Sequence, residues 1–281
     1  MVKIVFTKMV ATGNDFVVID NRHRGAESQS LRKLARKISD RKFGIGADGL
    51  LVLEKSRTAD FRMRIFNADG SEAEMCGNGA RCVALFVGLR TSCVVRRASC
   101  VGRKTKLKIE TRAGIIPAEV NGDNVKVRLT DPKGIKLDIP LRVNGRMIRV
   151  NFVNTGVPHA VIFCAQLDKL SISEMGRAVR FHEKFAPAGA NVNFVEVLKP
   201  DSIKIRTYER GVEDETLACG TGSTAAAIIF SLKTNFSGKV NVVTRSTELL
   251  KVYFRKDGKR LEDVWLEGKA GIVYKGEYLN V

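Results

Sequence analysis

The chain lacks any long hydrophobic run. Its longest uncharged stretch, Thr216–Leu232, is short for a bilayer span and contains several Gly, Ser and Thr residues, which favours a buried helix over a membrane segment. The amino-terminal residues Met1–Val10 hold two lysines within a short apolar run, with no small-residue cleavage pattern after them, so a signal peptide is not expected. These absences predict a cytoplasmic protein that does not bind a membrane.

The common signatures of metal and cofactor sites are also missing. No two of the six cysteines are spaced as C-x-x-C, and His23, His159 and His182 are scattered, so neither a zinc site nor a redox pair is indicated. Disulfides are not expected in a reducing compartment. Gly44–Gly49 matches G-x-G-x-x-G, but it follows a predicted helix and precedes a predicted strand, the reverse of the dinucleotide-binding order. We therefore expect no cofactor and no metal.

The length and composition of the chain indicate a globular protein of one or two domains. The 281 residues are 44% apolar and carry a formal net charge of +18, a content that supports a hydrophobic core. Such a charge raises nucleic-acid binding as an alternative function. No recognised binding motif accompanies the charge, and it is spread along the chain apart from a basic segment at 90–108. A strongly charged, solvated surface is the simpler interpretation, and we expect no nucleic-acid partner.

The sequence contains an internal repeat at an offset of 143 residues. Thr12–Ile19 aligns with Thr155–Ile162, since both are a Thr-Gly turn followed by an apolar run. The same offset aligns two further pairs, namely Gly46-Ala47-Asp48 with Gly189-Ala190-Asn191 and Cys76-Gly77-Asn78-Gly79-Ala80 with Cys219-Gly220-Thr221-Gly222-Ser223. Three separated matches at one offset indicate a duplicated unit.

Each copy is predicted to contain several strands and two helices. The spacing of apolar residues predicts helices over Leu31–Ser39 and Ser173–Phe185, and a helix after each Cys-Gly. Strands that follow strands, with few helices between them, favour an α+β fold rather than a doubly wound one. The Pro- and Gly-containing stretch Asp131–Arg146 is expected to be a hinge or a hairpin.

Cys76 and Cys219 both precede Gly-x-Gly where a loop becomes an uncharged, Ala-rich helix. A helix start presents unpaired N–H groups and partial positive charge, which favours a thiolate and can hold an anion. One such cysteine is more often part of a packed turn. Two at equivalent places in repeated halves suggest an acid and a base on opposite faces of one carbon, as inversion of a stereocentre requires.

These residues resemble the diaminopimelate epimerase family. The matching segments cover nearly the whole chain in the family's order: Thr12–Phe16, Phe66–Cys82, Gly156–His159, Asn191–Phe194 and Glu209–Gly222. The resemblance implies two pseudo-symmetric domains, each a barrel-like, mostly antiparallel sheet around a central helix. We expect an amino-terminal domain of residues 1–120 joined by the carboxy-terminal strand 270–281, and a second domain of 121–269, with the active site in the cleft between them.

The resemblance also implies an isomerase of lysine and cell-wall precursor biosynthesis. It would interconvert LL- and meso-2,6-diaminopimelate without a cofactor, with one thiolate and one thiol as a two-base pair, and it would form a homodimer. Carried over by position, the catalytic residues are Cys76 and Cys219, with His159 and Glu209 tuning the thiols. The substrate-binding residues implied are Asn14, Asn67, Gly77, Asn78, Asn191, Glu209, Arg210, Gly220 and Thr221.

The chain departs from the family pattern at three places. Val10-Ala11-Thr12 stands where the family often has His-Gly before the Gly-Asn-Asp-Phe motif, Val157 where Asn is common, and Gly49 where some members have Gln. A related amino-acid racemase with another substrate therefore remains an alternative. A thiol oxidoreductase is disfavoured because C-x-x-C is absent. Cys93 and Cys100, in the basic segment, are expected to be non-catalytic.

Overall fold

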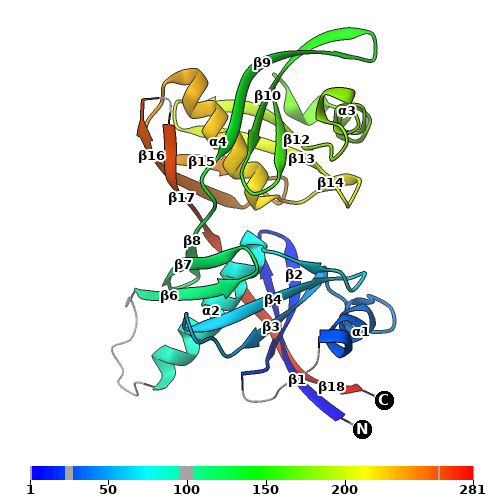
Figure 1. Ribbon diagram of the computed structural model, residues 1–281, viewed down its shortest axis with the longest axis vertical. Coiled ribbons are helices and arrows are strands. Elements are labelled where there is room, and N and C mark those ends of the chain that lie inside the picture. Colours follow the sequence, from blue (N-terminus) through cyan, green and yellow to red (C-terminus); the bar gives the residue numbers. More distant parts are fainter. Residues whose placement is uncertain (1, 23–27, 95–103, 259, 281) are drawn as a thin grey trace. The chain divides into compact units, whose positions relative to one another are not determined.

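The computed structural model describes residues 2–22, 28–94, 104–258 and 260–280. The chain divides into two compact units (Figure 1). Unit 1 comprises Met1–Val127 and Gly268–Val281, and unit 2 comprises Arg128–Glu267. The carboxy-terminal strand thus belongs to the first unit. The side chain of Cys93 and all of Cys100 lie outside the described residues.

Unit 1 is built on a mixed, mostly antiparallel sheet. The strands follow the spatial order β18-β1-β2-β3-β4-β6-β7-β8, with the short β5 added to β4. Among the strand pairs within the described residues, only β2–β3 and β4–β6 are parallel. The elements are β1 (Val2–Ala11), β2 (Asn14–Asp20), α1 (Ser28–Ser39), β3 (Gly49–Glu54), β4 (Phe61–Asn67), β5 (Glu72–Ala73), α2 (Gly77–Val94), β6 (Thr105–Thr111), β7 (Gly114–Asn121), β8 (Asn124–Arg128) and β18 (Gly271–Asn280).

Unit 2 repeats this plan strand for strand. Its order is β9-β10-β11-β12-β13-β15-β16-β17, with the short β14 added to β13, and only β11–β12 and β13–β15 are parallel. The elements are β9 (Lys133–Val143), β10 (Arg146–Asn154), β11 (Pro158–Phe163), η1 (Leu167–Lys169), α3 (Ile172–Arg180), η2 (Glu183–Phe185), β12 (Asn191–Lys199), β13 (Ser202–Glu209), β14 (Asp214–Thr216), α4 (Gly220–Thr234), β15 (Val240–Val243), β16 (Leu249–Asp257) and β17 (Arg260–Lys269).

The structure confirms the predicted α+β fold of two similar halves. Parallel pairs occupy equivalent positions in the two strand orders, and α2 and α4 begin at Gly77 and Gly220, again 143 residues apart. Each of these helices packs against strands from nearly the full width of its own sheet, from β1 to β7 for α2 and from β10 to β16 for α4. A helix can touch so many strands only when the sheet curls around it.

The central helices are buried on every side because they are enclosed by their sheets. In α4 all residues from Gly222 to Ser231 are buried, a pattern expected of a core helix rather than an amphipathic surface helix. The strands beneath are correspondingly apolar on both faces. Leu51 lies toward α2, in contact with the position a side chain on Gly79 would take, whereas Leu50 and Val52 pack in the cluster under α1. Successive strand residues therefore serve opposite layers.

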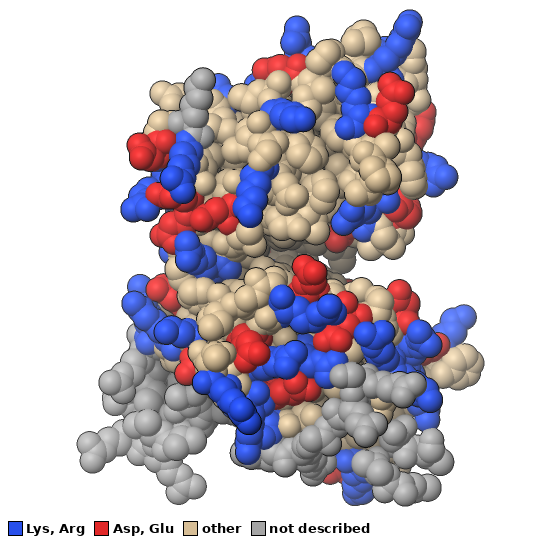
Figure 2. Space-filling model, viewed as in Figure 1, with Lys and Arg blue, Asp and Glu red and all other residues tan. Residues whose placement is uncertain are grey.

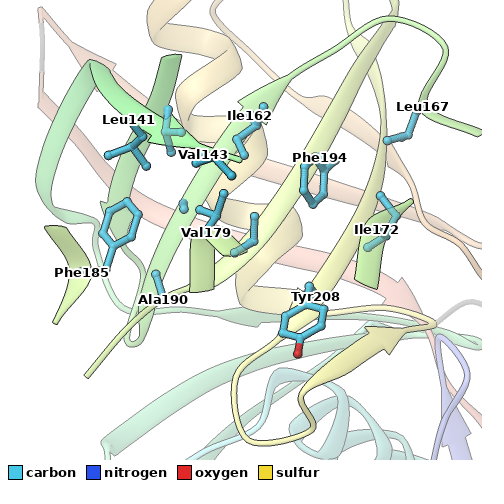
Figure 3. Packing of buried hydrophobic residues seen from close by; sticks show 13 residues of the cluster. Leu141, Val143, Ile162, Leu167, Ile172, Val179, Phe185, Ala190, Phe194 and Tyr208 are labelled. Atoms are coloured by element: carbon cyan, nitrogen blue, oxygen red, sulfur yellow. The ribbon is translucent and has the colours of Figure 1, made fainter. Parts of the chain in front are cut away.

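The outer helices α1 and α3 bury one face only. In unit 2 the cluster under α3 combines Val179 with Phe185, Phe194 and Tyr208 (Figure 3). Complete burial of one such side chain stabilises the fold by roughly 1.5–3 kcal/mol. Gly176 is required on α3 because a Cβ there would stand 2.5 Å from the Cβ of Tyr208, far inside van der Waals contact. The helix lies that close to the sheet because it has a glycine there.

Two sequence expectations are refined by the structure. The helix predicted over Ser173–Phe185 is instead α3 followed by the separate 3₁₀ turn η2, because His182 is extended, with φ −62° and ψ 138°, and its ring accepts the Lys184 N–H. The stretch predicted as a hinge or hairpin forms the β9–β10 hairpin, in which Asn144 and Gly145 adopt positive φ. Within the described ranges, no helix is long and apolar enough to cross a bilayer.

Candidate active site

In unit 1 the Cys76 thiol stands at the start of α2. Its backbone carbonyl accepts the N–H of Ala80 at 2.8 Å, which closes the first helical turn. The Cys76 Sγ lies 4.0 Å from Oδ1 of Asn14, and the same oxygen accepts an N–H of Asn78 at 3.4 Å. Cys76 is only partly buried, whereas Asn78 is buried. Asn14 and Asn78 thus lie beside the thiol of a partly buried cysteine.

The repeated Thr-Gly turn places Asn14 at this point. Thr12 and Gly13 adopt φ of 55° and 80° in the tight β1–β2 connection, the left-handed conformation that such turns need. Asn14 is the first residue of β2, paired with Ala11. A fully buried guanidinium, Arg81 of α2, donates to Oγ1 of Thr12 and Oδ1 of Asn78, both at 2.7 Å. The turn and the helix start are therefore tied together.

A charged network holds the other side of Asn14. Its Nδ2 donates to Asp48 at 2.5 Å, and Arg41 bridges Asp48 and Asp15 at 2.8 and 2.7 Å. Lys8, whose side chain is buried, pairs with Asp15 at 2.7 Å. Burial alone would raise the pKa of Asp15, but hydrogen bonds and charge from Arg41 and Lys8 outweigh it and lower that pKa to about 2. This carboxylate is ionised throughout the physiological range.

In unit 2 the Cys219 thiol occupies the equivalent helix start and is itself the N-cap of α4. The residue is extended, with φ −118° and ψ 115°, and its Sγ accepts the N–H of Gly222 at 3.4 Å. The hydroxyl of Thr221 lies 3.4 Å from the same sulfur. A backbone donor aimed at the sulfur stabilises negative charge there.

The repeated turn again contacts the start of its central helix. Oγ1 of Thr155 donates to the carbonyl of Thr221 at 3.1 Å, as Thr12 is joined to α2 through Arg81. Pro158 begins β11, and His159 pairs with Asn191 across the parallel β11–β12 pair. Asn191 Oδ1 accepts the backbone N–H of Arg210 at 2.7 Å. These contacts involve four of the predicted site residues of unit 2, namely His159, Asn191, Arg210 and Thr221.

His159 is fully buried. Desolvation, with a further contribution from the positive charge of Arg210, lowers the pKa of His159 to about 3. The imidazole is therefore neutral at physiological pH.

Two other cysteines differ from the helix-start pair. Cys82 is fully buried, and desolvation raises the pKa of its thiol. Cys164 is half-buried, and its thiol donates a hydrogen bond to the carbonyl of Val195. Cys82 is a core thiol.

The remaining predicted residues lie at strand ends. Asn67 ends β4 and donates to Ser71 Oγ at 2.9 Å. Glu209 ends β13, and its carbonyl accepts the N–H of Glu213 at 2.8 Å. Gly77 and Gly220 are the first residues of α2 and α4. Among the described side chains, no group of three or more His, Cys, Asp and Glu is arranged to hold a metal ion.

Sequence reasoning missed several residues that the structure connects to the site, above all Asp48, Arg41, Arg81 and Asn193. Asp48 aligns with the predicted site residue Asn191 in the repeat, but the segment served only as evidence for the duplication, and Asp48 itself was assigned no role. Asn193 falls in a segment of the family resemblance and was assigned no role. Buried hydrogen-bond partners are not visible in a sequence pattern, because their significance depends on which strands pair.

Comparison with known proteins decides the family. The diaminopimelate epimerase family model matches residues 6–134 and 151–273. The diaminopimelate epimerase of Aquifex aeolicus is 45% identical, with 96% of each chain covered, and that of Archaeoglobus fulgidus is 41% identical over 98% of this chain and 96% of the relative. The chain belongs to the diaminopimelate epimerase family.

Solved structures show that the epimerase fold extends to more distant proteins. A phenazine biosynthesis protein of the PhzF family from Bacillus anthracis superposes with a TM-score of 0.76 at 21% identity, with both chains fully covered. A probable proline racemase from Agrobacterium radiobacter gives a TM-score of 0.73 at 15% identity over 98% of this chain and 93% of that one. At such identities the likeness establishes the fold alone.

One departure of this epimerase from the family pattern has a structural basis. Gly49 begins β3 opposite Asn67, and a Cβ at position 49 would stand 2.7 Å from the carbonyl oxygen of Phe66. A side chain there therefore requires the β3 and β4 backbones to shift apart. Val157, another of the three departures, precedes β11 and is partly buried.

Proposed function

We propose that this epimerase interconverts LL- and meso-2,6-diaminopimelate by cofactor-independent proton transfer at the α-carbon, in lysine and cell-wall precursor biosynthesis. The observation that carries the proposal is the equivalence of Cys76 and Cys219. Each precedes the first residue of a buried central helix, in the same place of the same strand order. The full-length similarity to proteins named diaminopimelate epimerase supports this substrate.

The reaction uses the two sulfurs as a base and an acid. In the closed complex, one thiolate removes the α-proton from one face of the carbon, and the thiol of the other cysteine delivers a proton to the opposite face. The α-proton is very weakly acidic, so the carbanionic intermediate must be stabilised as it forms. The first N–H groups of α2 and α4, at Gly77-Asn78 and Gly220-Thr221, are suited to hold the substrate carboxylate.

The remaining site residues bind the substrate and tune the thiols. Amides bind carboxylate and ammonium groups without acting as competing bases, and a guanidinium binds a carboxylate through two parallel hydrogen bonds. These roles fall to Asn14, Asn67, Asn191 and Arg210. His159 and Glu209 tune the protonation of the cysteines, His159 as a neutral ring.

Deuterium incorporation tests the proposal directly. LL-diaminopimelate incubated with the protein in deuterated water should yield the meso isomer with solvent deuterium at the α-carbon. Cys76→Ala and Cys219→Ala should each abolish inversion, whereas Cys164→Ala, a matched thiol away from both helix starts, should retain wild-type turnover. Absence of exchange in the wild type, or undiminished turnover in either helix-start variant, would refute the mechanism.

A racemase of the same mechanism with another amino acid is the second candidate. Val157 and Gly49 favour it, since Val157 lacks the Asn side chain common in the family and Gly49 lacks the Gln of some members. The exchange assay run over a panel of amino acids separates the two, because the preferred substrate should exchange fastest.

We also propose that the enzyme is a cytoplasmic homodimer. Adjacent strands β1 and β18 of unit 1 carry exposed apolar side chains, namely Val5, Ile272, Val273, Tyr274 and Leu279, which a second copy would cover. Basic and acidic side chains are interspersed on the face drawn in Figure 2, which supports a solvated surface. Sedimentation analysis of the wild type should give a dimer, and Tyr274→Lys should shift it toward monomer; a wild-type monomer would refute this part.

A further inference from the structure

The buried residue Asn193 contacts three neighbours in unit 2 with its side-chain amide. It lies on β12, and its Nδ2 is 3.0 Å from the carbonyl oxygen of Ala160 and 3.1 Å from Nδ1 of His159. Its Oδ1 accepts the hydroxyl of Thr207, on β13, at 3.1 Å. Asn193 and His159 are both fully buried. All the hydrogen-bonding groups of this amide are therefore used inside the protein.

These contacts determine the orientation of the amide. The carbonyl of Ala160 can only accept a hydrogen bond, so the amide atom next to it must be the NH₂ group. A rotated amide would place two oxygens in contact and would leave the Ala160 carbonyl unpaired in the core, at a cost of about 1–3 kcal/mol. The second hydrogen of the NH₂ group then points at Nδ1 of His159.

The orientation of Asn193 in turn fixes the proton of His159. Because Nδ1 accepts a hydrogen bond from Asn193, it carries no proton itself. The proton of the neutral ring is therefore on Nε2. Nε2 is buried and has no hydrogen-bond partner within residues 2–22, 28–94, 104–258 and 260–280. A buried N–H without a protein partner is rare in native structures and points to an acceptor that arrives with the ligand.

We propose that Asn193 is a positioning residue that locks His159 in the tautomer protonated at Nε2, so that the imidazole acts on the substrate and the thiols only as a hydrogen-bond donor and takes a proton from neither. With Nδ1 occupied and Nε2 protonated, the ring has no lone pair left for a base. This role rests on the proposed function, because it leaves proton removal to the cysteines. It distinguishes His159 from the histidine bases of many other enzymes.

Asn193 also contacts the helix start that carries Cys219. A Cβ added at Gly222 would collide with Oδ1 of Asn193 and would lie 3.3 Å from the sulfur of Cys219. Gly222 is also the residue whose N–H is donated to that sulfur. The amide therefore lies between the imidazole and the first turn of α4, which explains why a small residue is needed there.

Nitrogen-15 NMR of the protein with labelled histidine tests the tautomer without any assumption about function. The chain has three histidines, so His23→Gln and His182→Gln assign the spectrum. The wild type should show His159 neutral, with its proton on Nε2, from pH 5 to 9. Asn193→Asp, whose carboxylate accepts a proton from Nδ1, should move the proton to Nδ1 or charge the ring. Asn151→Asp, at another buried amide of unit 2 that bonds a strand carbonyl, should leave His159 unchanged.

Activity measurements complete the test. Asn193→Asp should lower kcat for α-proton exchange by roughly 10²-fold, with a shifted pH profile, while circular dichroism shows a folded protein. A wild-type ring protonated on Nδ1, or an Asn193→Asp spectrum identical to the wild type, overturns the positioning role. Unchanged kcat with a changed tautomer overturns its part in catalysis. If the wild type exchanges no amino acid, the proposed function fails while the tautomer assignment is still decided by the spectrum.

Discussion

The side-chain Nδ2 of Asn14 donates a hydrogen bond to Asp48 at 2.5 Å, and this bond determines which atom of the amide faces the thiol of Cys76. Because an ionised carboxylate only accepts, Nδ2 must face Asp48, and Oδ1 must face Cys76 and Asn78. Asp48 is in turn held by Arg41. The acidic residue thus orients a predicted substrate-binding side chain without itself being part of the family's set of site residues.

Replacement of Asp48 should therefore damage catalysis more than folding. In Asp48→Ala the amide of Asn14 is released and can rotate, and we expect kcat/KM to fall by roughly 10²-fold, the usual cost of a misplaced site group. Asp168→Ala removes another exposed carboxylate, paired with Lys204 away from the site, and should leave the kinetics unchanged. Equal kinetics in the two variants would contradict the positioning role of Asp48.

The ion pairs of Asp15 predict acid sensitivity. Its pKa is about 2 in the folded protein, below the unfolded value of about 3.9, so the stabilisation is complete above the unfolded value and is lost as pH falls toward 2. Asp15→Asn also leaves the buried Lys8 charge uncompensated and should reduce the free energy of unfolding by about 3 kcal/mol at neutral pH. Urea unfolding at pH 7 and pH 3 measures both effects, and the deficit of the variant should shrink at the lower pH.

His159 contributes in the same direction as Asp15, but over a higher pH range. Its folded pKa of about 3 lies below the unfolded value of about 6.5, so between these values the unfolded chain binds a proton that the folded protein does not. Stability therefore falls as pH drops from about 6.5 toward 3. His159→Gln should flatten this part of the stability profile, measured by urea unfolding from pH 7 to 4. A slope identical to that of the wild type would show that the ring is not buried neutral.

Gly222 should tolerate no side chain. Gly222→Ala introduces a Cβ that collides with Oδ1 of Asn193, and such overpacking typically costs about 1–3 kcal/mol. The displaced turn also moves the N–H that contacts Cys219, so exchange activity should fall as well. Gly271→Ala is the control, because nothing lies within 4 Å of its added Cβ and its φ is not positive. Thermal unfolding and the exchange assay together distinguish lost stability from a disturbed site.

Oxidation provides a further test of the paired thiols. If Cys76 and Cys219 flank one carbon in the closed enzyme, air should convert them to a disulfide and inactivate it, and dithiothreitol should restore turnover. Mass spectrometry of the oxidised protein should find a peptide that links these two cysteines. Inactivation that dithiothreitol does not reverse, or a link that excludes either residue, would argue against this arrangement.

The duplication, the α+β class and the two helix-start cysteines could be predicted from the sequence, because they depend on local features. A Thr-Gly turn, an alternating strand and a Cys-Gly-x-Gly helix start each act over a few residues, and the repetition at one offset makes them visible. The ends of the helices are harder to predict from local patterns. The helical stretch after α3 is interrupted because His182 is extended, and its ring accepts the N–H of Lys184 two residues later.

Which polar groups support the site could not be predicted from the sequence, because it depends on how the strands pair. Asn14 and Asp48 are joined because β2 and β3 run side by side in parallel, and Asn193 reaches His159 because β11 and β12 do the same. These pairs are separated by more than thirty residues in the chain. No local pattern distinguishes such an Asn or Asp from one in an ordinary turn, since the hydrogen bonds that give it a role exist only when the strands have paired and excluded water.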